Sequence, residues 1–385
     1  MAVPLLDIKA QNSALKPEIM RALESVVDSG GFILGPQVEA LEGELAALTG
    51  AKYGIGLSSG SDALIVALMA LGIGPGDEVL VPTFTFFATA GAVSRLGATP
   101  VFVDSREEDF NLSPADFERK ISPRSKAVIP VHLFGQCAPM KEILEIARAH
   151  KLVVIEDAAQ ALGAACREGK ACSIGAMGIT SFYPTKNLGA MGDAGMLFTS
   201  DDALADTCRK LRNHGMSPRY YHAMVGGNFR LDAMQAAILR TKLKHLSTYS
   251  GGRTANAAEY NERLGAKRGF ALAGCNTKGA KIVLPHALDG NLHVWNQYTV
   301  RVLGTGRRDA LKAFLAAKGI GSDIYYPLTL DRQECFKGRS TGGETCTVAH
   351  ALAGEVLSLP VYAEMSNASL DEVAAALEQF VSESA

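Results

Sequence analysis

Short runs rich in β-branched residues alternate with stretches of helical period between about Ala51 and Ser200. Alternating strands and helices are typical of a largely parallel sheet that helices cover on both faces. Helical segments are expected at Ala63–Leu71 and Met140–Ala149. Strands are expected at Glu78–Val81, Pro100–Val103, Ala127–Val131, Leu152–Ile155, Ile179–Phe182 and Gly195–Thr199. The sequence therefore predicts an α/β fold for this part of the chain.

The pattern changes after about Leu246, where a smaller α+β domain is expected. Its elements are predicted as strands at Tyr298–Leu303 and Ser322–Tyr326, a helix at Arg308–Lys318, and a last helix that begins at Ser369 with Glu372 completing a capping box. The boundary is expected inside a long helix near Leu239–Thr254. This division gives a large domain over residues 1–245 and a small domain over residues 246–385.

Composition and charge exclude several classes of protein. The formal net charge of -2 and the pI near 6.5 give no sign of the basic face that nucleic-acid binding requires. No apolar run reaches the roughly 20 residues that span a bilayer, and the N-terminus lacks the apolar segment of a signal peptide. We therefore expect a cytoplasmic protein that binds neither nucleic acid nor membrane.

The chain has seven cysteines, an odd number, and no two of them form a C-x-x-C pair. A disulfide framework or a zinc site is therefore not expected, and we predict no metal. Most of the cysteines are interpreted as small buried apolar residues in a reducing cytosol.

The run Ser58–Leu64 joins a strand-like segment to an apolar helix through serine and glycine residues. The N-terminus of a helix offers unpaired N–H groups and a positive dipole end, which suit a phosphate group. Gly60 would permit close approach of the backbone, and Ser61 could donate its hydroxyl. On its own the run fits an ordinary helix N-cap equally well.

An apolar strand ends in Glu156 and Asp157. In open α/β sheets, ligands bind at the carboxyl ends of the strands, where a carboxylate can hold a proton on a heterocyclic nitrogen. Glu156 is interpreted as a solvated strand end. For Asp157 the following motif favours a functional role.

Lys186 follows an apolar strand within the loop 180–189, which proline and glycine delimit, and Ser181 and Thr185 flank it as possible phosphate ligands. A lysine near apolar groups has a lowered pKa, which favours Schiff-base formation. The phosphate-type loop, the strand-end Asp157 and this lysine are the set that a pyridoxal 5′-phosphate site needs.

The sequence resembles the DegT/DnrJ/EryC1/StrS family of pyridoxal-phosphate-dependent nucleotide-sugar aminotransferases over nearly its whole length. Six motifs in order are a specific signal. These motifs are residues 59–64, 82–89, 156–160, 181–186, 227–232 and 357–360, and the resemblance begins before them, at residues 31–36. It implies the aspartate-aminotransferase fold, in which a three-layer, mostly parallel large domain is followed by a smaller α+β domain.

The resemblance also implies roles for matching positions. Lys186 would form the Schiff base and shuttle protons, and Asp157 would keep the pyridine nitrogen protonated. Gln160 would lie beside the ring, and Phe86 would stack on it, although core packing is the commoner role of an aromatic residue. The phosphate ligands would be Gly60, Ser61, Ser181 and, from the neighbouring subunit, Asn228. A shared ligand of that kind makes a homodimer obligatory.

The substrate contacts follow less directly. Arg230 either contacts the nucleotide sugar or belongs to an interface ion pair, and the sequence favours neither interpretation over the other. His132 is expected to be structural. The family often has His-Tyr-Pro in the small domain, whereas this chain has Tyr325-Tyr326-Pro327. Tyr325 and Tyr326 are predicted to contact the substrate, and tyrosine in place of histidine changes which groups can contact the sugar.

The implied reaction moves an amino group from L-glutamate to a keto nucleotide sugar, with pyridoxamine 5′-phosphate as the amino form of the cofactor. The run Asn228-Phe229-Arg230-Leu231-Asp232 is closer to family members that act on 3-keto sugars, whereas 4-keto members more often read Asn-Tyr-Arg-Met. We therefore expect a 3-keto hexose or hexuronate and a product used in amino-sugar and polysaccharide biosynthesis.

Three other functions fit the sequence less well. A cofactor-dependent sugar dehydratase would replace the lysine, usually by histidine, but Lys186 is present. A non-catalytic regulator on the same fold would not need the lysine, the aspartate and the phosphate loop together. A dinucleotide enzyme would place its glycines after a strand, whereas the glycines at 72–76 follow a helix.

Overall fold

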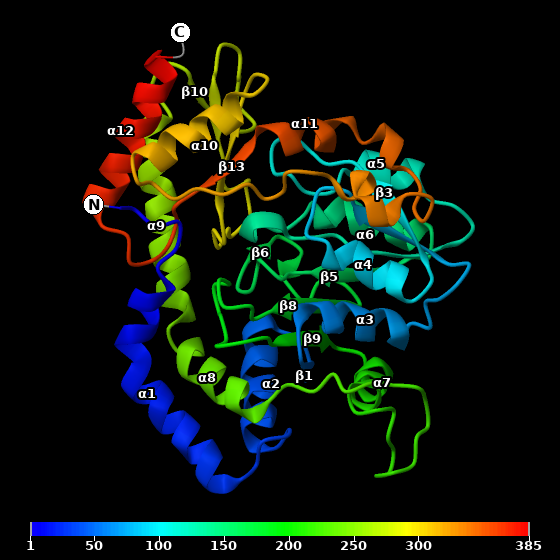
Figure 1. Ribbon diagram of the computed structural model, residues 1–385. Helices are drawn as coiled ribbons and strands as arrows, with labels where there is room; N and C mark the ends of the chain where they lie inside the picture. Colours follow the sequence, from blue (N-terminus) through cyan, green and yellow to red (C-terminus); the bar gives the residue numbers. More distant parts are fainter. Residues whose placement is uncertain (1, 384–385) are drawn as a thin grey trace.

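The computed structural model describes residues 2–383 and contains a seven-stranded sheet with the order β1-β9-β8-β5-β4-β2-β3 (Figure 1). Five neighbouring strands, β8 to β3 in this order, run parallel, and β9 runs antiparallel to both β8 and β1. The strands are β1 (Tyr53–Leu57), β2 (Glu78–Pro82), β3 (Thr99–Val103), β4 (Ser125–Val128), β5 (Val153–Asp157), β8 (Met177–Ser181) and β9 (Gly195–Thr199). The predicted strands are confirmed, and the sheet is mixed only through β9.

Helices cover both faces of this sheet, as expected. One face packs against α3 (Gly60–Ala70), α4 (Ala88–Arg95) and α7 (Asp202–Arg212). The other packs against α2 (Pro36–Thr49), α5 (Pro114–Arg119), α6 (Met140–Ala149) and α8 (Ala233–Leu243). Successive residues of β2 alternate between these cores, with Val79 and Val81 on the first face and Leu80 on the second. This burial on both faces explains why the strands read as continuous apolar runs.

A second sheet has the order β10-β11-β12-β13. Its strands are β10 (Phe270–Leu272), β11 (Ile282–Leu284), β12 (Tyr298–Val302) and β13 (Val356–Leu359). The helices that share its core are α9 (Leu246–Leu264), α10 (Arg307–Ala317) and α12 (Asn367–Glu383). Val3 belongs to the same core cluster, and α9 runs from the large sheet towards the second sheet (Figure 1).

The remaining elements connect or flank these two sheets. α1 (Ile8–Ser29) packs along α8, and a small hairpin joins β6 to β7. The other short elements are β6 (Ala165–Cys166), β7 (Gly169–Lys170), η1 (Leu133–Gly135), η2 (Leu330–Arg332), η3 (Glu334–Phe336), η4 (Gly343–Thr345) and the helix α11 (Thr347–Glu355).

Three details differ from the sequence-based expectations. The predicted strand Ser322–Tyr326 is wrong, because only Asp323 forms an isolated bridge and Tyr326 packs on Phe84 and Phe86 instead of continuing a strand. The last helix begins at Asn367, because Ser366 rather than Ser369 caps it: the Ser366 hydroxyl accepts the Ser369 N–H at 3.1 Å. The long helix expected near Leu239–Thr254 is two helices, α8 and α9.

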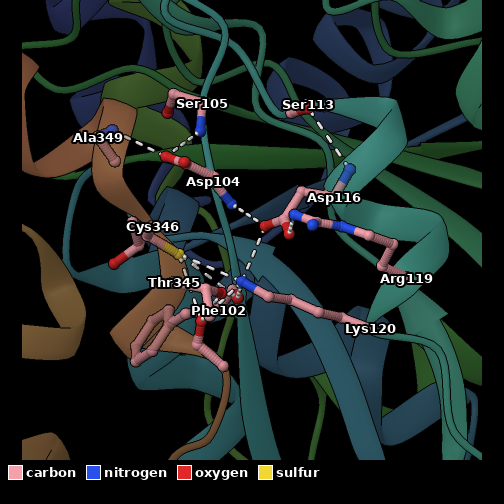
Figure 2. A network of polar contacts seen from close by, with 12 residues as sticks. Phe102, Asp104, Ser105, Ser113, Asp116, Arg119, Lys120, Thr345, Cys346 and Ala349 are labelled. Atoms are coloured by element: carbon pink, nitrogen blue, oxygen red, sulfur yellow. Dashed lines mark hydrogen bonds and ion pairs between the residues drawn. The ribbon is translucent and has the colours of Figure 1, made fainter.

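A polar network fastens the segment before α11 to the edge strand β3 (Figure 2). The Lys120 ammonium donates to the carbonyl oxygens of Phe102 and Gly342 at 2.8 and 2.6 Å, and it pairs with Asp116 at 2.8 Å. Asp104 accepts the N–H groups of Val348 and Ala349, which are in the first turn of α11. Because the first N–H groups of a helix lack partners within it, Asp104 completes this helix from a distant strand.

The core cluster on the α3 face of the large sheet also contains residues of α11, so the chain returns to the large sheet after β12. The division at residues 245 and 246 therefore stays a prediction. All seven cysteines are free, and four of them are buried, as expected for most. Within residues 2–383, none of the helices has the length and apolar character that crossing a membrane requires.

Candidate active site

A cavity of about 600 Å³ opens at the carboxyl ends of the parallel strands. The loops after β1, β2, β5 and β8 supply most of its walls, and Gln297 before β12 and the two tyrosines in the loop after α10 complete it. The predicted site residues that line it are Gly60, Ser61, Phe86, Asp157, Gln160, Ser181, Lys186, Tyr325 and Tyr326. Residues far apart in the sequence thus meet around one space large enough for a small organic ligand.

One end of the cavity is formed by the N-terminus of α3. Ser59 caps this helix, since its hydroxyl accepts the Asp62 N–H at 3.0 Å. A Cβ atom at Gly60 would lie 2.8 Å from the Cβ of Ser181, so only glycine fits there. The first N–H groups of the helix and the hydroxyls of Ser61 and Ser181 therefore converge on the cavity, an arrangement that suits a phosphate group.

Asp157 is the last residue of β5, and its carboxyl group is 5% exposed. Thr89 donates to Oδ2 at 2.8 Å, and the Ala159 N–H donates to Oδ1 at 3.2 Å. Burial raises the pKa of Asp157, and these two hydrogen bonds oppose that shift. A carboxylate held in this way can pair with a protonated nitrogen in the cavity.

Lys186 also lines the cavity. Burial lowers the pKa of its ammonium group from the ordinary 10.5 to about 8, while the charge of Asp157 opposes this shift. A neutral amine is the form that attacks a carbonyl carbon, so the surroundings of Lys186 prepare it for Schiff-base chemistry. The adjacent Asn187 is buried and holds the loop, because its amide donates to Val294 O and accepts from Asn296 Nδ2, both at 2.8 Å.

Phe86, Tyr326 and Gln160 form the remaining wall. Phe86 is 58% exposed and does not lie in the core, and its ring is 6.2 Å from that of Tyr326. Gln160 donates to the Tyr326 hydroxyl at 3.3 Å and accepts the Phe134 N–H at 2.7 Å. Burial raises the pKa of Tyr326, which therefore keeps its proton and can donate it to a ligand. The wall thus offers an aromatic face and a hydroxyl donor.

Two predicted residues lie outside the cavity wall. Asn228 is exposed and pairs through its backbone with Asn213. Arg230 donates to the side chain of Asn213 at 2.7 Å, and its buried Nε has no partner among residues 2–383. The roles suggested for Asn228 and Arg230 stay predictions.

The interpretation of Glu156 as a solvated strand end is wrong. Its carboxylate is fully buried and accepts the N–H groups of Cys172, Ile174 and Gly175 at 2.7–3.0 Å. It also accepts Nε2–H of His132 at 2.9 Å, while Nδ1 of the same ring accepts the Ala138 N–H. Side chains alternate along a strand, so Glu156 points away from the cavity that Asp157 faces. His132 therefore has a structural position, as expected.

Sequence reasoning missed several residues at the site. Thr89 ends the run 82–89 that carries the family resemblance, so its hydroxyl was available as a signal. Gln297 comes from the second sheet, and nothing in the local sequence separates it from an ordinary surface residue. Further polar residues that line the cavity and were not assigned a role are Ser59, Thr85, Tyr183 and Asp193.

The residues present fit pyridoxal 5′-phosphate. The glycine-lined helix end suits its phosphate, the buried carboxylate suits its ring nitrogen, and Lys186 carries the amine that its aldehyde needs. The exposed face of Phe86 suits a flat ring.

Comparisons with known proteins agree with this geometry. Residues 13–378 match the DegT/DnrJ/EryC1/StrS aminotransferase family. The chain is 46% identical to a pleiotropic regulatory protein of Geobacillus stearothermophilus, over 99% of each chain. It is 44% identical to UDP-N-acetyl-3-dehydro-α-D-glucosamine 3-aminotransferase of Acidithiobacillus ferrooxidans, over 98% of each chain.

The fold is also that of a solved enzyme. The crystal structure of DesV from S. venezuelae, in complex with a ketimine intermediate, has a TM-score of 0.92 and 40% identity and covers 99% of this chain and 98% of its own. The predicted fold class and cofactor are thereby confirmed. The chain belongs to the DegT/DnrJ/EryC1/StrS aminotransferase family and is a pyridoxal-phosphate-dependent nucleotide-sugar aminotransferase.

Proposed function

We propose that this aminotransferase takes its amino group from L-glutamate and delivers it to a 3-keto nucleotide hexose or hexuronate. The observation that carries the proposal is the meeting of Lys186 and the buried Asp157 in one cavity whose far end suits a phosphate. When bound, pyridoxal 5′-phosphate supplies a conjugated ring that withdraws electrons from the reacting carbon.

The residues of the chain supply positioning and proton transfer. Lys186 Nζ takes the proton from Cα of the amino donor and later returns a proton to the carbon of the keto sugar, because its lowered pKa leaves the amine able to act as a base near neutral pH. Asp157 would hold a proton on the ring nitrogen, and Phe86 would pack against the ring face. Gln160, which donates to the Tyr326 hydroxyl, would lie beside the ring.

At the phosphate end, Gly60, Ser61 and Ser181 bind the cofactor phosphate, and Asn228 of a second copy completes the set. An exposed Asn228 outside the wall supports this proposal, because a residue in that position can reach another subunit's site. Exposed apolar side chains support a homodimer: Phe32, Ile33, Tyr220, Tyr221 and Val225 are all at least 47% exposed.

The shared site can be tested by mixing two inactive variants. Lys186→Ala and Asn228→Ala should each lose activity alone. Refolding equal amounts together should restore about a quarter of the wild-type sites, because about half of the dimers are then heterodimers and one of the two sites in each is intact. Equal mixing without any recovery, in a mixture shown by native mass spectrometry to contain heterodimers, would contradict the shared site.

The 3-keto preference rests on two observations. The run Asn228–Asp232 is closer to that of 3-keto members, and a relative that is 44% identical is named for a 3-dehydro sugar. In this proposal Arg230, Tyr325 and Tyr326 contact the sugar nucleotide. Incubation with L-glutamate and matched 3-keto and 4-keto sugar nucleotides, followed by mass spectrometry, tests it: amination of the 4-keto sugar alone would overturn the 3-keto preference.

A regulatory role is the other candidate, since a relative at 46% identity is named a pleiotropic regulatory protein. The lowered pKa of Lys186 favours turnover, because a protein that only binds a ligand does not need a reactive amine. We also propose a cytoplasmic location, which two exposed free thiols, Cys275 and Cys335, support.

A further inference from the structure

Thr89 contacts two residues of the cavity wall, Asp157 closely and Thr85 at longer range. It lies in the first turn of α4, is fully buried, and does not line the cavity. Its hydroxyl donates to Oδ2 of Asp157 at 2.8 Å, and the Thr85 hydroxyl lies at the edge of hydrogen-bond distance from it, at 3.5 Å. Of these two contacts of the Thr89 hydroxyl, the hydrogen bond to Asp157 is the shorter.

The two oxygens of Asp157 are held by different donors. Thr89 binds Oδ2, and the Ala159 N–H binds Oδ1, so rotation of the carboxyl group would break both bonds. The lone pairs that remain are those available to a ligand in the cavity. A hydroxyl donor also favours the charged form of a buried acid, and the Thr89 bond is the largest influence opposing the raised pKa of Asp157.

We propose that Thr89 is a positioning residue whose hydroxyl aims the Asp157 carboxylate at the ring nitrogen of the cofactor and holds it in the charged form. This inference rests on the proposed role of Asp157. It assigns Thr89 no contact with the cofactor or the substrate. Its effect must therefore depend on the ring nitrogen and on the proton that this nitrogen carries.

Thr89→Val keeps the shape of the side chain and removes the donor, whereas Thr89→Ser keeps the donor. Apo-protein is titrated with pyridoxal 5′-phosphate, and the dissociation constant is measured by absorbance. Thr89→Val should bind the cofactor roughly 10-fold more weakly, the size expected when a hydrogen bond to a charged group is lost, and Thr89→Ser should bind like the wild type.

The same titration is repeated with an analogue that has carbon in place of the ring nitrogen. Asp157 has no proton to hold in this analogue, so wild type, Thr89→Val and Thr89→Ser should bind it equally. Equal weakening of cofactor and analogue in Thr89→Val would mean that Thr89 only supports the fold, and no weakening of either would mean that the hydroxyl does nothing for Asp157. Either result overturns the inference.

If Thr89→Val does not fold, Thr89→Ala and Thr89→Ser give the same comparison, because these two differ only in the hydroxyl. Failure of the wild type to bind pyridoxal 5′-phosphate would overturn the proposed function together with this inference. Normal binding by the wild type with no effect of the substitutions would overturn the role of Thr89 alone.

Discussion

At the scale of single residues, the site contains two buried groups of opposite charge, the carboxyl group of Asp157 and the ammonium group of Lys186. Burial raises the pKa of Asp157 and lowers that of Lys186, so each group is pushed towards its neutral form. Hydrogen bonds from Thr89 and Ala159 work against this for Asp157, whereas Lys186 has the charge of Asp157 to oppose it. The hydrogen bonds thus support the charged form of Asp157, and burial supports the neutral amine of Lys186.

The pKa of Lys186 predicts how the apo-protein captures its cofactor. Only the neutral amine attacks the aldehyde, and the neutral fraction rises as pH rises through the pKa. The rate of capture, followed by absorbance, should therefore increase with pH, with a midpoint near pH 8, and then level off. Lys186→Ala should show no such phase, and a midpoint near the ordinary value of 10.5 would contradict the lowered pKa.

Sequence reasoning identified the wall residues that carry a chemical signature of their own. Lys186 and Asp157 follow apolar strands, and Gly60 begins a helix, so local patterns located them. The prediction for Glu156 was wrong because the local sequence does not show whether a carboxylate at a strand end accepts hydrogen bonds from backbone N–H groups or from water. Those donors come from a loop some 16–19 residues later, and no local pattern announces them.

At the scale of elements, α11 depends on residues from the large sheet for its position. Asp104 completes its N-terminus, and Lys120 holds the segment before it by two carbonyl oxygens and the Asp116 carboxylate (Figure 2). The Lys120 side chain is 12% exposed, whereas the neighbouring Arg119 is 71% exposed although it pairs with the same aspartate.

This difference in burial predicts different costs of substitution. Lys120→Met should lower the free energy of unfolding by about 3 kcal/mol, because it removes a charged, mostly buried donor that two carbonyl oxygens and the Asp116 carboxylate share. Arg119→Met should cost less than about 1 kcal/mol, since exposed ion pairs contribute little. Urea denaturation measures both, and equal costs would show that the network does not hold the segment.

Strand and helix positions were predictable where periodicity is long and regular, as in α6, whose bounds match the expectation of Met140–Ala149. The prediction failed at Ser322–Tyr326, because contacts with Phe84 and Phe86 rather than strand pairing decide its path. The start of α12 was misplaced by two residues, since Ser366 and Ser369 are both plausible caps and only the hydrogen bond distinguishes them.

At the scale of the whole molecule, Asn187 connects the Lys186 loop to the residues that lead into β12. Both of its amide hydrogen bonds, to Val294 and Asn296, are 2.8 Å long. Arg253 of α9 holds the same stretch, donating to the carbonyl oxygens of Trp295 and Asn296. The loop that carries Lys186 is thus held by the residues that precede β12 and not by its own contacts alone.

Asn187→Ala should therefore destabilise the protein by about 2–3 kcal/mol, because it leaves one buried acceptor and one donor unpaired. Asn276→Ala is the matched control: this residue is exposed and bonds only within its own turn, so it should cost less than about 0.5 kcal/mol. Chemical denaturation of the apo-proteins measures both values. Similar values for the two variants would argue against the connection.

The most direct test of the proposed reaction is the absorbance spectrum of the holo-protein before and after addition of L-glutamate. We predict a yellow protein whose visible band falls as a near-ultraviolet band of pyridoxamine 5′-phosphate rises, with no such response in Lys186→Ala. A wild-type protein that is supplied with pyridoxal 5′-phosphate and remains colourless, or whose yellow band does not change with L-glutamate, would contradict the proposal.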